Sequence, residues 1–285
     1  MKILRTRNDV AEFIQPIHSQ KLSIGFVPTM GALHEGHLSL VERAVKENQF
    51  TIVSVFVNPT QFNDKRDYAL YPRDEEKDFQ LLAKQGVSAV FAPSEEEMYP
   101  PHDTREKKIF ELGKCAETME GKYRPGHFQG VAQIVSRLFE IVQPTRAYFG
   151  EKDFQQIAVI RKLIESEGIK VDIVACPIKR AHDGLALSSR NTLLSKEERE
   201  LAPQIYETLK YSVEYSQNHS VRATHDTVVE RIDAIPGMKV EYFEIVDART
   251  LTPVEEWEES PWIVGCITVY CGKTRLIDNI TYRLP

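Results

Sequence analysis

Two histidines three positions apart, in a glycine-containing segment, are the strongest chemical signal in this sequence. His34 and His37 lie within residues 28–37, and Gly36 stands between them. Residues at this spacing share a helix face, and a helix N-terminus offers free N–H groups and partial positive charge to a phosphate. Gly36 would let a flat ring lie close to the backbone. The segment therefore predicts a nucleoside triphosphate held where a strand turns into a helix.

A zinc site is the main alternative for the same segment. His34, Glu35 and His37 resemble the H-E-x-x-H zinc motif, but their spacing is one residue shorter. No third cluster of His or Cys follows along the chain. An ordinary solvated turn is a second alternative. The coincidence of two histidines with glycines favours the phosphate site over both.

Two amide side chains follow a second apolar run. Asn58 and Gln61 lie in residues 56–62, where they could donate to and accept from a polyhydroxy or carboxylate substrate. Taken alone, the same residues are also typical of an Asn-Pro turn. Further along, Arg124 precedes a helical pattern and could reach an oxyanion, although a surface loop with chance basic residues would look similar.

Two later segments add cationic and hydroxyl groups. Lys152 follows the apolar run at 147–149 at a strand-to-helix turn, where it could contact phosphate oxygens, and Gln156 lies one turn further on. Ser188, Ser189 and Arg190 offer neutral and charged donors for phosphates. No Ser/His/Asp or Cys/His triad stands out. This combination of groups stabilises charge at phosphorus rather than attacking carbon.

Composition and charge narrow the class of protein. The 285 residues allow two modest domains, and 42 acidic against 36 basic residues give a net charge of −6, which argues against a nucleic-acid partner. We see no secretory signal and no apolar segment long enough to span a bilayer, so we expect a cytoplasmic protein with no membrane partner. The four cysteines form no C-x-x-C pair and are expected to be free thiols.

The first part of the chain alternates between strand-like and helix-like patterns. Strands are predicted at 22–27, 51–57, 88–92, 146–149 and 171–175, and helices at 38–48, 74–85, 128–142 and 153–167. Asp153 is the expected N-cap of the last helix and Gly168 its C-terminal glycine. Such alternation predicts a Rossmann-like, doubly wound parallel sheet over residues 1–177, with ligands beyond the C-terminal ends of the strands.

The pattern changes after Pro177. Helices are predicted at 196–216, after Ser195 as N-cap, and at 221–235, followed by strands at 240–246, 262–270 and 274–280. Residues 178–285 should therefore form a smaller α+β domain. Residues 94–126 show no clear period and are interpreted as a long excursion near the site that could act as a mobile lid.

Taken together, five segments closely resemble the pantothenate synthetase (pantoate–β-alanine ligase) family. They are residues 28–37, 56–62, 124–130, 150–156 and 187–191. Residues 34–37 also resemble the H-x-G-H signature of the wider nucleotidylyltransferase superfamily. Residues 187–190 resemble its second signature, with Arg190 where a lysine often stands. The segments at 58–62 and 150–156 narrow the resemblance to the family.

The resemblance implies a two-step, ATP-dependent ligase with Mg²⁺. The carboxylate of (R)-pantoate would attack the α-phosphate of ATP, and β-alanine would then displace AMP to give pantothenate. The implied catalytic residues are His37, His34 and Lys152, and the implied substrate residues are Gln61, Gln156, Asn58 and Arg124. The ATP site would comprise Met30, Gly31, Ala32, Leu33, His34, Glu35, Gly36, His37, Gly150, Glu151, Lys152, Asp153, Lys179, Leu187, Ser188, Ser189 and Arg190.

Some implications of the resemblance are less direct. Mg²⁺ would be carried by ATP, with Asp78 a weak candidate for an outer contact and no metal site on the protein itself. Thr60 and Lys179 stand where relatives often carry apolar residues. The family is commonly homodimeric, and closure of the second domain over the ATP site is a hypothesis.

Three other functions stay open at this point. Another adenylyl or cytidylyl transferase would release pyrophosphate but form no amide. A nucleotide-sensing module would bind ATP without turnover. A fragment of an RNA-binding synthetase is the third alternative, against which the acidic balance weighs.

Overall fold

The computed structural model describes residues 1–62, 68–69, 71–101 and 108–284. Within these ranges, the larger part of the chain is built on a parallel sheet of six strands in the order β1-β4-β3-β2-β5-β6. The strands are β1 (Lys2–Leu4), β2 (Ile24–Thr29), β3 (Phe50–Val55), β4 (Ala89–Phe91), β5 (Arg146–Gly150) and β6 (Asp172–Cys176). The Rossmann-like doubly wound sheet is thereby confirmed.

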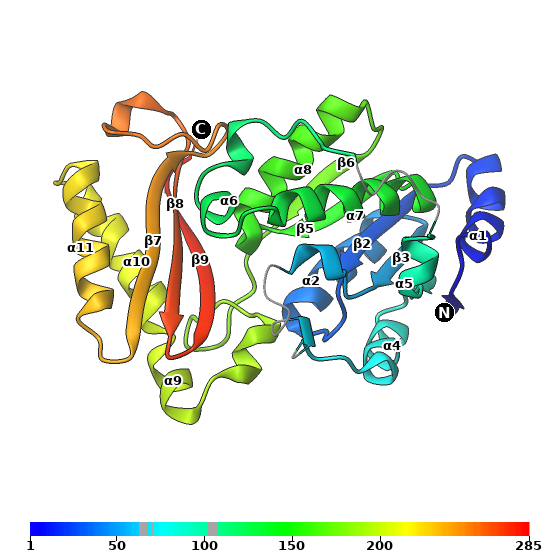
Figure 1. Cartoon of the computed structure of the whole chain (residues 1–285), viewed down its shortest axis with the longest axis horizontal. Helices are drawn as coiled ribbons and strands as arrows, with labels where there is room; N and C mark the ends of the chain where they lie inside the picture. Colours follow the sequence, from blue (N-terminus) through cyan, green and yellow to red (C-terminus); the bar gives the residue numbers. More distant parts are fainter. Residues whose placement is uncertain (63–67, 70, 102–107, 285) are drawn as a thin grey trace.

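Helices cover both faces of this sheet because successive strand residues point to opposite sides. Phe26 and Ile52 belong to the apolar cluster on one side, whereas Val27 and Val53 belong to the cluster on the other. The first cluster includes residues of α1 (Arg7–Ser19), α7 (His127–Val142) and α8 (Phe154–Glu167), and the second includes residues of α2 (Glu35–Glu47) and α4 (Glu75–Lys84). Figure 1 shows these helices around the sheet.

The strand order places a topological switch point between β2 and β5. From β2 the sheet grows through β3 and β4 in one direction, and β5 then pairs with the other edge of β2, with Gly25 opposite Arg146. Loops that leave two such strands diverge and open a crevice at their C-terminal ends. The histidine segment follows β2 and the Lys152 segment follows β5, so both border this crevice.

The second part of the chain is a smaller α+β unit. The antiparallel strands β7 (Met238–Asp247), β8 (Ile263–Cys271) and β9 (Thr274–Arg283) form one sheet in chain order. On one face the sheet packs against α10 (Gln204–Ser216) and α11 (Val221–Asp233). On the other face it packs against Met119 and Phe154 of the larger part. The expected C-terminal α+β arrangement is confirmed.

Several boundaries differ from the sequence prediction. The strand β1 and the helix α1 were not predicted, although Thr6 and Asp9 form a capping box at the start of α1. The helix expected at 196–216 is two helices, α9 (Lys196–Leu201) and α10, because Pro203 has no N–H for the helical ladder. Ser195 does cap α9, and Gly168 ends α8 in the left-handed region as predicted.

Asp153 stands at the N-cap position of α8, as predicted, but its side chain does not act as a cap. Its side chain makes no cap hydrogen bond, and a 3₁₀ turn, η4 (Glu151–Asp153), precedes the helix. The carboxylate of Asp153 instead accepts from the ammonium of Lys152. Within the described ranges, all four cysteines are free, as expected, and three of them are buried.

The excursion at 94–126 lies partly outside the described residues, at 102–107. Its described parts include α5 (Glu95–Met98), the 3₁₀ turn η3 (Lys114–Ala116) and α6 (Glu120–Tyr123). Met98, Phe110 and Leu112 are buried in the core of the larger domain. These described parts are thus anchored by apolar side chains, and lid motion of the segment stays a prediction.

A buried ionic network joins the two parts of the chain. Glu120 of α6 accepts two hydrogen bonds from Arg275 of β9, at 2.8 and 2.6 Å, and one from the Tyr242 hydroxyl at 2.8 Å. Burial alone would raise the pKa of Glu120, but the bonds and charge of Arg275 outweigh it and lower the pKa to about 2. Glu241 also accepts from the Arg275 Nε at 2.9 Å. The two parts are therefore tied by a fully ionised pair.

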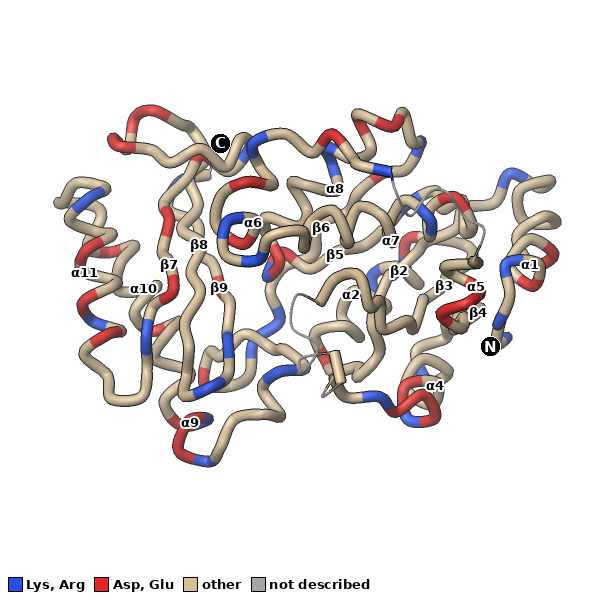
Figure 2. Tube along the Cα trace, in the orientation of Figure 1, with Lys and Arg blue, Asp and Glu red and all other residues tan. Residues whose placement is uncertain are grey.

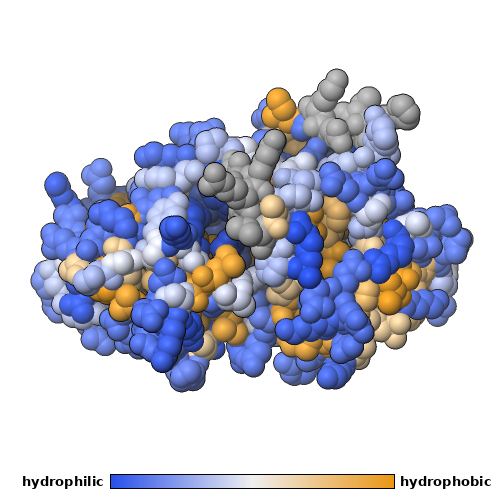
Figure 3. Space-filling view, turned by 60° about the horizontal axis from the view of Figure 1, so that its bottom comes forward, coloured by the Kyte–Doolittle hydropathy of each residue, from blue (hydrophilic) through white to orange (hydrophobic). Residues whose placement is uncertain are grey.

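The surface carries charges of both signs. Figure 2 shows acidic and basic residues interspersed on α4, α9 and α11. In Figure 3 one face is mostly hydrophilic, with apolar residues in separate small groups. Among the described residues, no helix is both long and apolar enough to cross a bilayer.

Candidate active site

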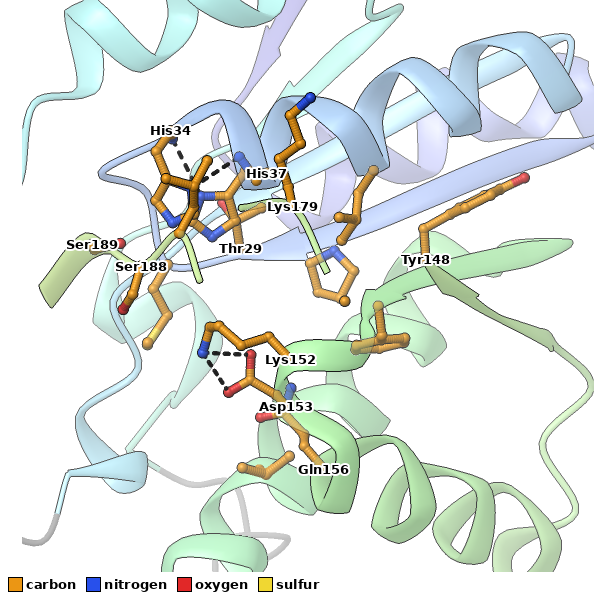
Figure 4. Close-up of a pocket in the computed structure, with 18 of the residues that line it drawn as sticks. Thr29, His34, His37, Tyr148, Lys152, Asp153, Gln156, Lys179, Ser188 and Ser189 are labelled. Atoms are coloured by element: carbon orange, nitrogen blue, oxygen red, sulfur yellow. Dashed lines mark hydrogen bonds and ion pairs between the residues drawn. The ribbon is translucent and has the colours of Figure 1, made fainter. Parts of the chain in front are cut away.

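A cavity lies at the switch point, lined by segments from both parts of the chain (Figure 4). His34, His37, Lys152, Asp153 and Gln156 line it, and so do most other residues expected in the ATP site. Those others are Met30, Gly36, Gly150, Lys179, Leu187, Ser188, Ser189 and Arg190. The residue types singled out from the sequence thus converge in one place.

The backbone at the start of α2 fixes how both histidine rings are turned. His34 is the N-cap, and its Nδ1 accepts from the Gly36 N–H at 3.1 Å. The Nδ1 of His37 accepts from the His34 N–H at 3.4 Å. A ring nitrogen that accepts carries no proton, so each neutral ring bears its proton on Nε2. The arrangement leaves an Nε2–H donor on each ring for a ligand.

Both rings are neutral at pH 7 in this structure. Burial lowers the pKa of His34 to about 4, with the Lys152 charge acting in the same direction. Burial lowers the pKa of His37 to about 3, and His34 and Lys152 add to the shift. A polyanion beside the rings would oppose these effects. The resting site therefore offers two neutral hydrogen-bond donors beside the ammonium of Lys152.

Gly36 is required by the position of the His34 ring. A Cβ built on Gly36 would lie 2.7 Å from Cε1 and 2.8 Å from Nδ1 of that ring. Distances this short are essentially never observed, so any side chain here would push the ring away. The sequence expectation that a flat ring lies against Gly36 is met by His34 itself.

Asp78 holds the histidine loop, residues 30–34, which joins β2 to α2. Its two carboxylate oxygens accept from the N–H groups of Ala32 and Leu33, both at 2.8 Å. Ala32 has a φ of 51°, a conformation that is costly for a residue other than glycine. Asp78 is buried, and its bonds hold this strained turn in place. The structure thus shows Asp78 bonded to the loop, and an outer contact of Asp78 to Mg²⁺ stays a prediction.

Lys152 lies across the cavity from the histidines. Its Nζ lies 3.3 and 3.2 Å from the two carboxylate oxygens of Asp153, and Figure 4 shows the pair facing the cavity. Gln156 follows one turn later on α8 and also lines the cavity. The ammonium is therefore held by a single carboxylate, against which a triphosphate could compete.

Another side of the cavity is formed by residues 177–179 and 187–190, which lie in the part of the chain between the two sheets. Leu187 donates its N–H to the Lys179 carbonyl at 3.0 Å, which fixes the wall that carries Ser188 and Ser189. The Ser189 hydroxyl lies 3.4 Å from the Ala32 carbonyl. This is a direct contact between the second signature segment and the histidine loop.

Gln61 lines the cavity at the end of the 3₁₀ turn η1 (Pro59–Gln61). The backbone carbonyl of Gln61 accepts from His127 Nδ1 at 3.1 Å, and His127 Nε2 lies 3.1 Å from Arg124 Nη1. A Cβ on Gly130 would lie 2.2 Å from the Thr60 carbonyl, so η1 packs directly on the backbone of α7. These contacts hold the backbone of Gln61 at the cavity wall.

Asn58 and Arg124 are not among the residues that line this cavity. Asn58 is fully buried, with its side chain bonded to Thr60, the Gly130 carbonyl and the Tyr99 hydroxyl. Arg124 contacts Glu120 and His127 and lines a smaller neighbouring cavity. In this structure Asn58 bonds to η1 and α7, whereas Arg124 bonds to α6 and to the Gln61 backbone carbonyl of η1. Of the other expected ATP residues, the cavity lining leaves out Gly31, Ala32, Leu33, Glu35 and Glu151.

The sequence reasoning missed the apolar wall of the cavity. One side is formed by residues of α7 at helical spacing, namely Val131, Ile134, Val135 and Leu138, and Thr29 and Tyr71 also contribute. The apolar repeat of α7 predicted a helix, but it could not distinguish a cavity wall from a core face. The cavity thus combines an apolar side with a side rich in phosphate donors.

The cavity chemistry suits a reaction at phosphorus with a partly apolar acid. The two Nε2–H donors and the ammonium of Lys152 can neutralise oxygen charge, while Gln61 and Gln156 can bond a polar carboxylic acid next to the apolar wall. Among the described residues, no group of three or more His, Cys, Asp or Glu is placed to hold a metal ion.

Comparisons with known proteins agree with this description. The model of the pantoate–β-alanine ligase family matches residues 2–281. The pantothenate synthetase of Porphyromonas gingivalis is 55% identical over 283 residues, covering 99% of this chain and all of the relative. That of Bacteroides thetaiotaomicron is also 55% identical, with 99% of each chain covered.

Solved structures give the same result. The pantothenate synthetase of Thermus thermophilus has a TM-score of 0.91 at 43% identity, covering 99% of this chain and 100% of its own. The pantoate–β-alanine ligase of Francisella tularensis, complexed with beta-gamma ATP and β-alanine, has a TM-score of 0.81 at 36% identity, covering 99% and 98%. With nearly its whole length matched by the family model and by relatives more than half identical, the chain belongs to the pantoate–β-alanine ligase family.

Proposed function

We propose how this chain carries out the reaction of its family, the ATP-dependent condensation of (R)-pantoate with β-alanine through a pantoyl adenylate. The observation that carries the proposal is the cavity in Figure 4, where phosphate donors from the loops after β2 and β5 face each other. ATP would lie along the histidine loop and the segment at 187–190. Pantoate would lie between the apolar wall of α7 and the amides of Gln61 and Gln156.

In the first step, the pantoate carboxylate attacks the α-phosphorus of ATP and pyrophosphate leaves. Lys152 and the Nε2–H groups of His34 and His37 would bond the phosphate oxygens that gain charge. Since each Nδ1 is occupied by a backbone N–H, both rings are set to donate rather than to accept a proton. Charge stabilisation is therefore the role that we assign to them.

In the second step, the amine of β-alanine attacks the acyl carbon and AMP leaves. No protein nucleophile is needed, because the mixed anhydride already carries a good leaving group. Ser188, Ser189 and Arg190 would hold the phosphate of AMP through this step. We assign Asn58 and Arg124 to the support of η1, through which they act on Gln61.

Mg²⁺ would be bound mainly by the oxygens of ATP. Asp78 uses both carboxylate oxygens for backbone N–H groups and Asp153 faces Lys152, so the chain offers no free pair of carboxylates in the described part of the cavity. A cation that keeps several waters and binds substrate phosphates fits this donor set. Its chemistry would be to neutralise the leaving pyrophosphate.

Three further proposals follow from the family resemblance. We propose that the chain forms a homodimer, that it acts in the cytoplasm and that the two domains meet near residues 177 and 178. The separate apolar cores of the two sheets support the domain boundary. Light scattering on the purified protein would test the dimer, and limited proteolysis would test the boundary.

An assay of AMP release tests the proposed reaction. Pantoate, ATP and β-alanine are supplied together and then omitted one at a time, while AMP and pyrophosphate are measured. We expect AMP release only with all three substrates, and pantoate-dependent exchange between pyrophosphate and ATP without β-alanine. Pyrophosphate release without any amide product would indicate a nucleotidyl transferase instead, and ATP binding without turnover would indicate a sensing module.

A further inference from the structure

One side chain of the smaller domain contacts the turn that carries Lys152. Asn279 of β9 donates through Nδ2 to the Glu151 carbonyl at 2.8 Å and to the Lys152 carbonyl at 3.2 Å. Both neighbours are acceptors, so only the NH₂ end of the amide can face them. Asn279 is buried. Its two bonds therefore hold two successive peptide units of η4.

The preceding residue of the same strand holds the opposite wall of the cavity. Asp278 accepts from Arg180 at 2.6 and 2.9 Å in a bidentate pair, and Arg180 adjoins Lys179 of the cavity lining. Asp278 Oδ1 also accepts from the Asn279 N–H at 2.8 Å, which restricts the backbone between them. Two neighbouring residues of β9 thus connect the smaller sheet to both the Lys152 turn and the Lys179 segment.

The fold explains why these contacts come from β9. In Figure 1, β9 is the strand of the smaller sheet on the side of the larger domain. Residues 278 and 279 lie opposite Ile267 and Cys266 of β8, in the middle of the strand rather than at a loose end. Asn279 therefore stands on a rigid element, whereas Lys152 stands on a short turn between β5 and α8.

We propose that Asn279 is a positioning residue for Lys152, and that it makes the placement of the catalytic ammonium depend on the seating of the smaller domain. The inference rests on the proposed role of Lys152 in the first step. Asn279 touches no substrate in this arrangement and acts through the backbone of η4. Without its two donors the turn could shift, and a displacement of about 1 Å can lower a rate by roughly 100-fold.

The test is a double-mutant cycle between Asn279→Ala and Lys152→Ala, read out as single-turnover formation of pantoyl adenylate. We expect Asn279→Ala to lower this rate about 10- to 100-fold. In the Lys152→Ala background, the same substitution should change the residual rate by less than about threefold, because the group that it positions is gone. Thr281→Ala, at an exposed position of the same strand, should leave the rate unchanged.

Several outcomes would overturn the inference. They are an unchanged rate in Asn279→Ala, an equal loss in both backgrounds, or a rate that falls only in step with the melting temperature. Asn279→Ser, which keeps one donor, carries the same cycle if the alanine variant does not fold, and a smaller loss is then expected. A wild-type protein that forms no adenylate would contradict the proposed function rather than the role of Asn279.

Discussion

The ring centroids of His34 and His37 lie 4.1 Å apart, and each ring accepts a backbone N–H bond through its Nδ1. Two neutral donors are thereby presented side by side at the N-terminus of α2. The pair costs little reorganisation when a phosphate arrives, because the backbone has already set both tautomers.

The first prediction concerns the phosphate donors. His34→Ala, His37→Ala and Lys152→Ala should each lower the rate of pantoate-dependent pyrophosphate release by about 10- to 1,000-fold. Circular dichroism and melting should show that the fold survives. Wild-type turnover in the His34 and Lys152 variants would refute the assigned roles.

Gly36→Ala should reduce activity through the His34 ring. The new methyl group would collide with that ring, so we expect a loss comparable to that of His34→Ala. The matched control is Gly36→Ala in the His34→Ala background, where the methyl group has no ring to displace. Steady-state rates of Gly36→Ala, His34→Ala and the double variant test this explanation. A full additional loss of rate in the double variant would contradict a steric effect on the His34 ring.

Acid should destabilise the protein through its buried neutral histidines. Burial lowers the pKa of His127 to about 4, as it lowers those of His34 and His37. The unfolded chain takes up these protons near pH 6.5, so stability is present above that pH and is lost as the pH falls toward 4. For His127 the expected loss is about 2 kcal/mol, measured by urea unfolding at pH 7 and pH 4.5.

A variant separates this effect from the titration of carboxylates. His127→Asn should be less stable at pH 7 but should lose less stability between pH 7 and pH 4.5 than the wild-type protein. Equal pH dependence of the two proteins would show that His127 is not the group responsible.

Nucleotide binding should protect the second signature segment, residues 187–190, from amide hydrogen exchange. Ser189 already contacts the Ala32 carbonyl without ligand, and ATP would add contacts to both sides. We expect amide hydrogen exchange over residues 188–191 to slow when ATP is added. Equal exchange with and without ATP would argue against closure of the smaller domain.

Removing one partner of the pair between buried Glu120 and half-buried Arg275 should strongly destabilise the protein. Arg275→Ala leaves Glu120 buried without its main partner, which should lower the free energy of unfolding by about 3–5 kcal/mol. Arg222→Ala is the control, since that side chain is 92% exposed and should change stability by less than about 0.5 kcal/mol. Chemical denaturation of both variants measures the difference, and similar values for the two would contradict the prediction.

The alternation of strands and helices predicted the parallel sheet, because each apolar run and each helical repeat reflects burial directly. The order of the strands was not predictable in the same way, since periodicity does not encode which strands pair. The position of the switch point between β2 and β5 therefore came only from the structure. Thr6 and Asp9, which form the capping box of α1, are a sequence pattern that is typical of a helix start.

The residues of the candidate site were also only partly predictable from the sequence. The histidines and Lys152 stand out because their types and their turns are unusual together. Asn58 looked like a substrate amide, but its bonds go to Thr60, Tyr99 and the Gly130 carbonyl. A sequence cannot tell an amide that binds the backbone from one that binds a ligand. Asn279 was missed because its partners are carbonyls 128 and 127 positions away along the chain.

The apolar wall of α7 bears on how strictly the enzyme selects its acid. A wall made of aliphatic side chains penalises a slimmer acid only through lost contact, about 0.8 kcal/mol for each missing methylene-sized group. Discrimination between neighbouring homologues is then about fourfold per group, far below what a steric gate or an unpaired polar group gives. An analogue with one methyl group fewer should consequently still be a substrate, used about fourfold more slowly.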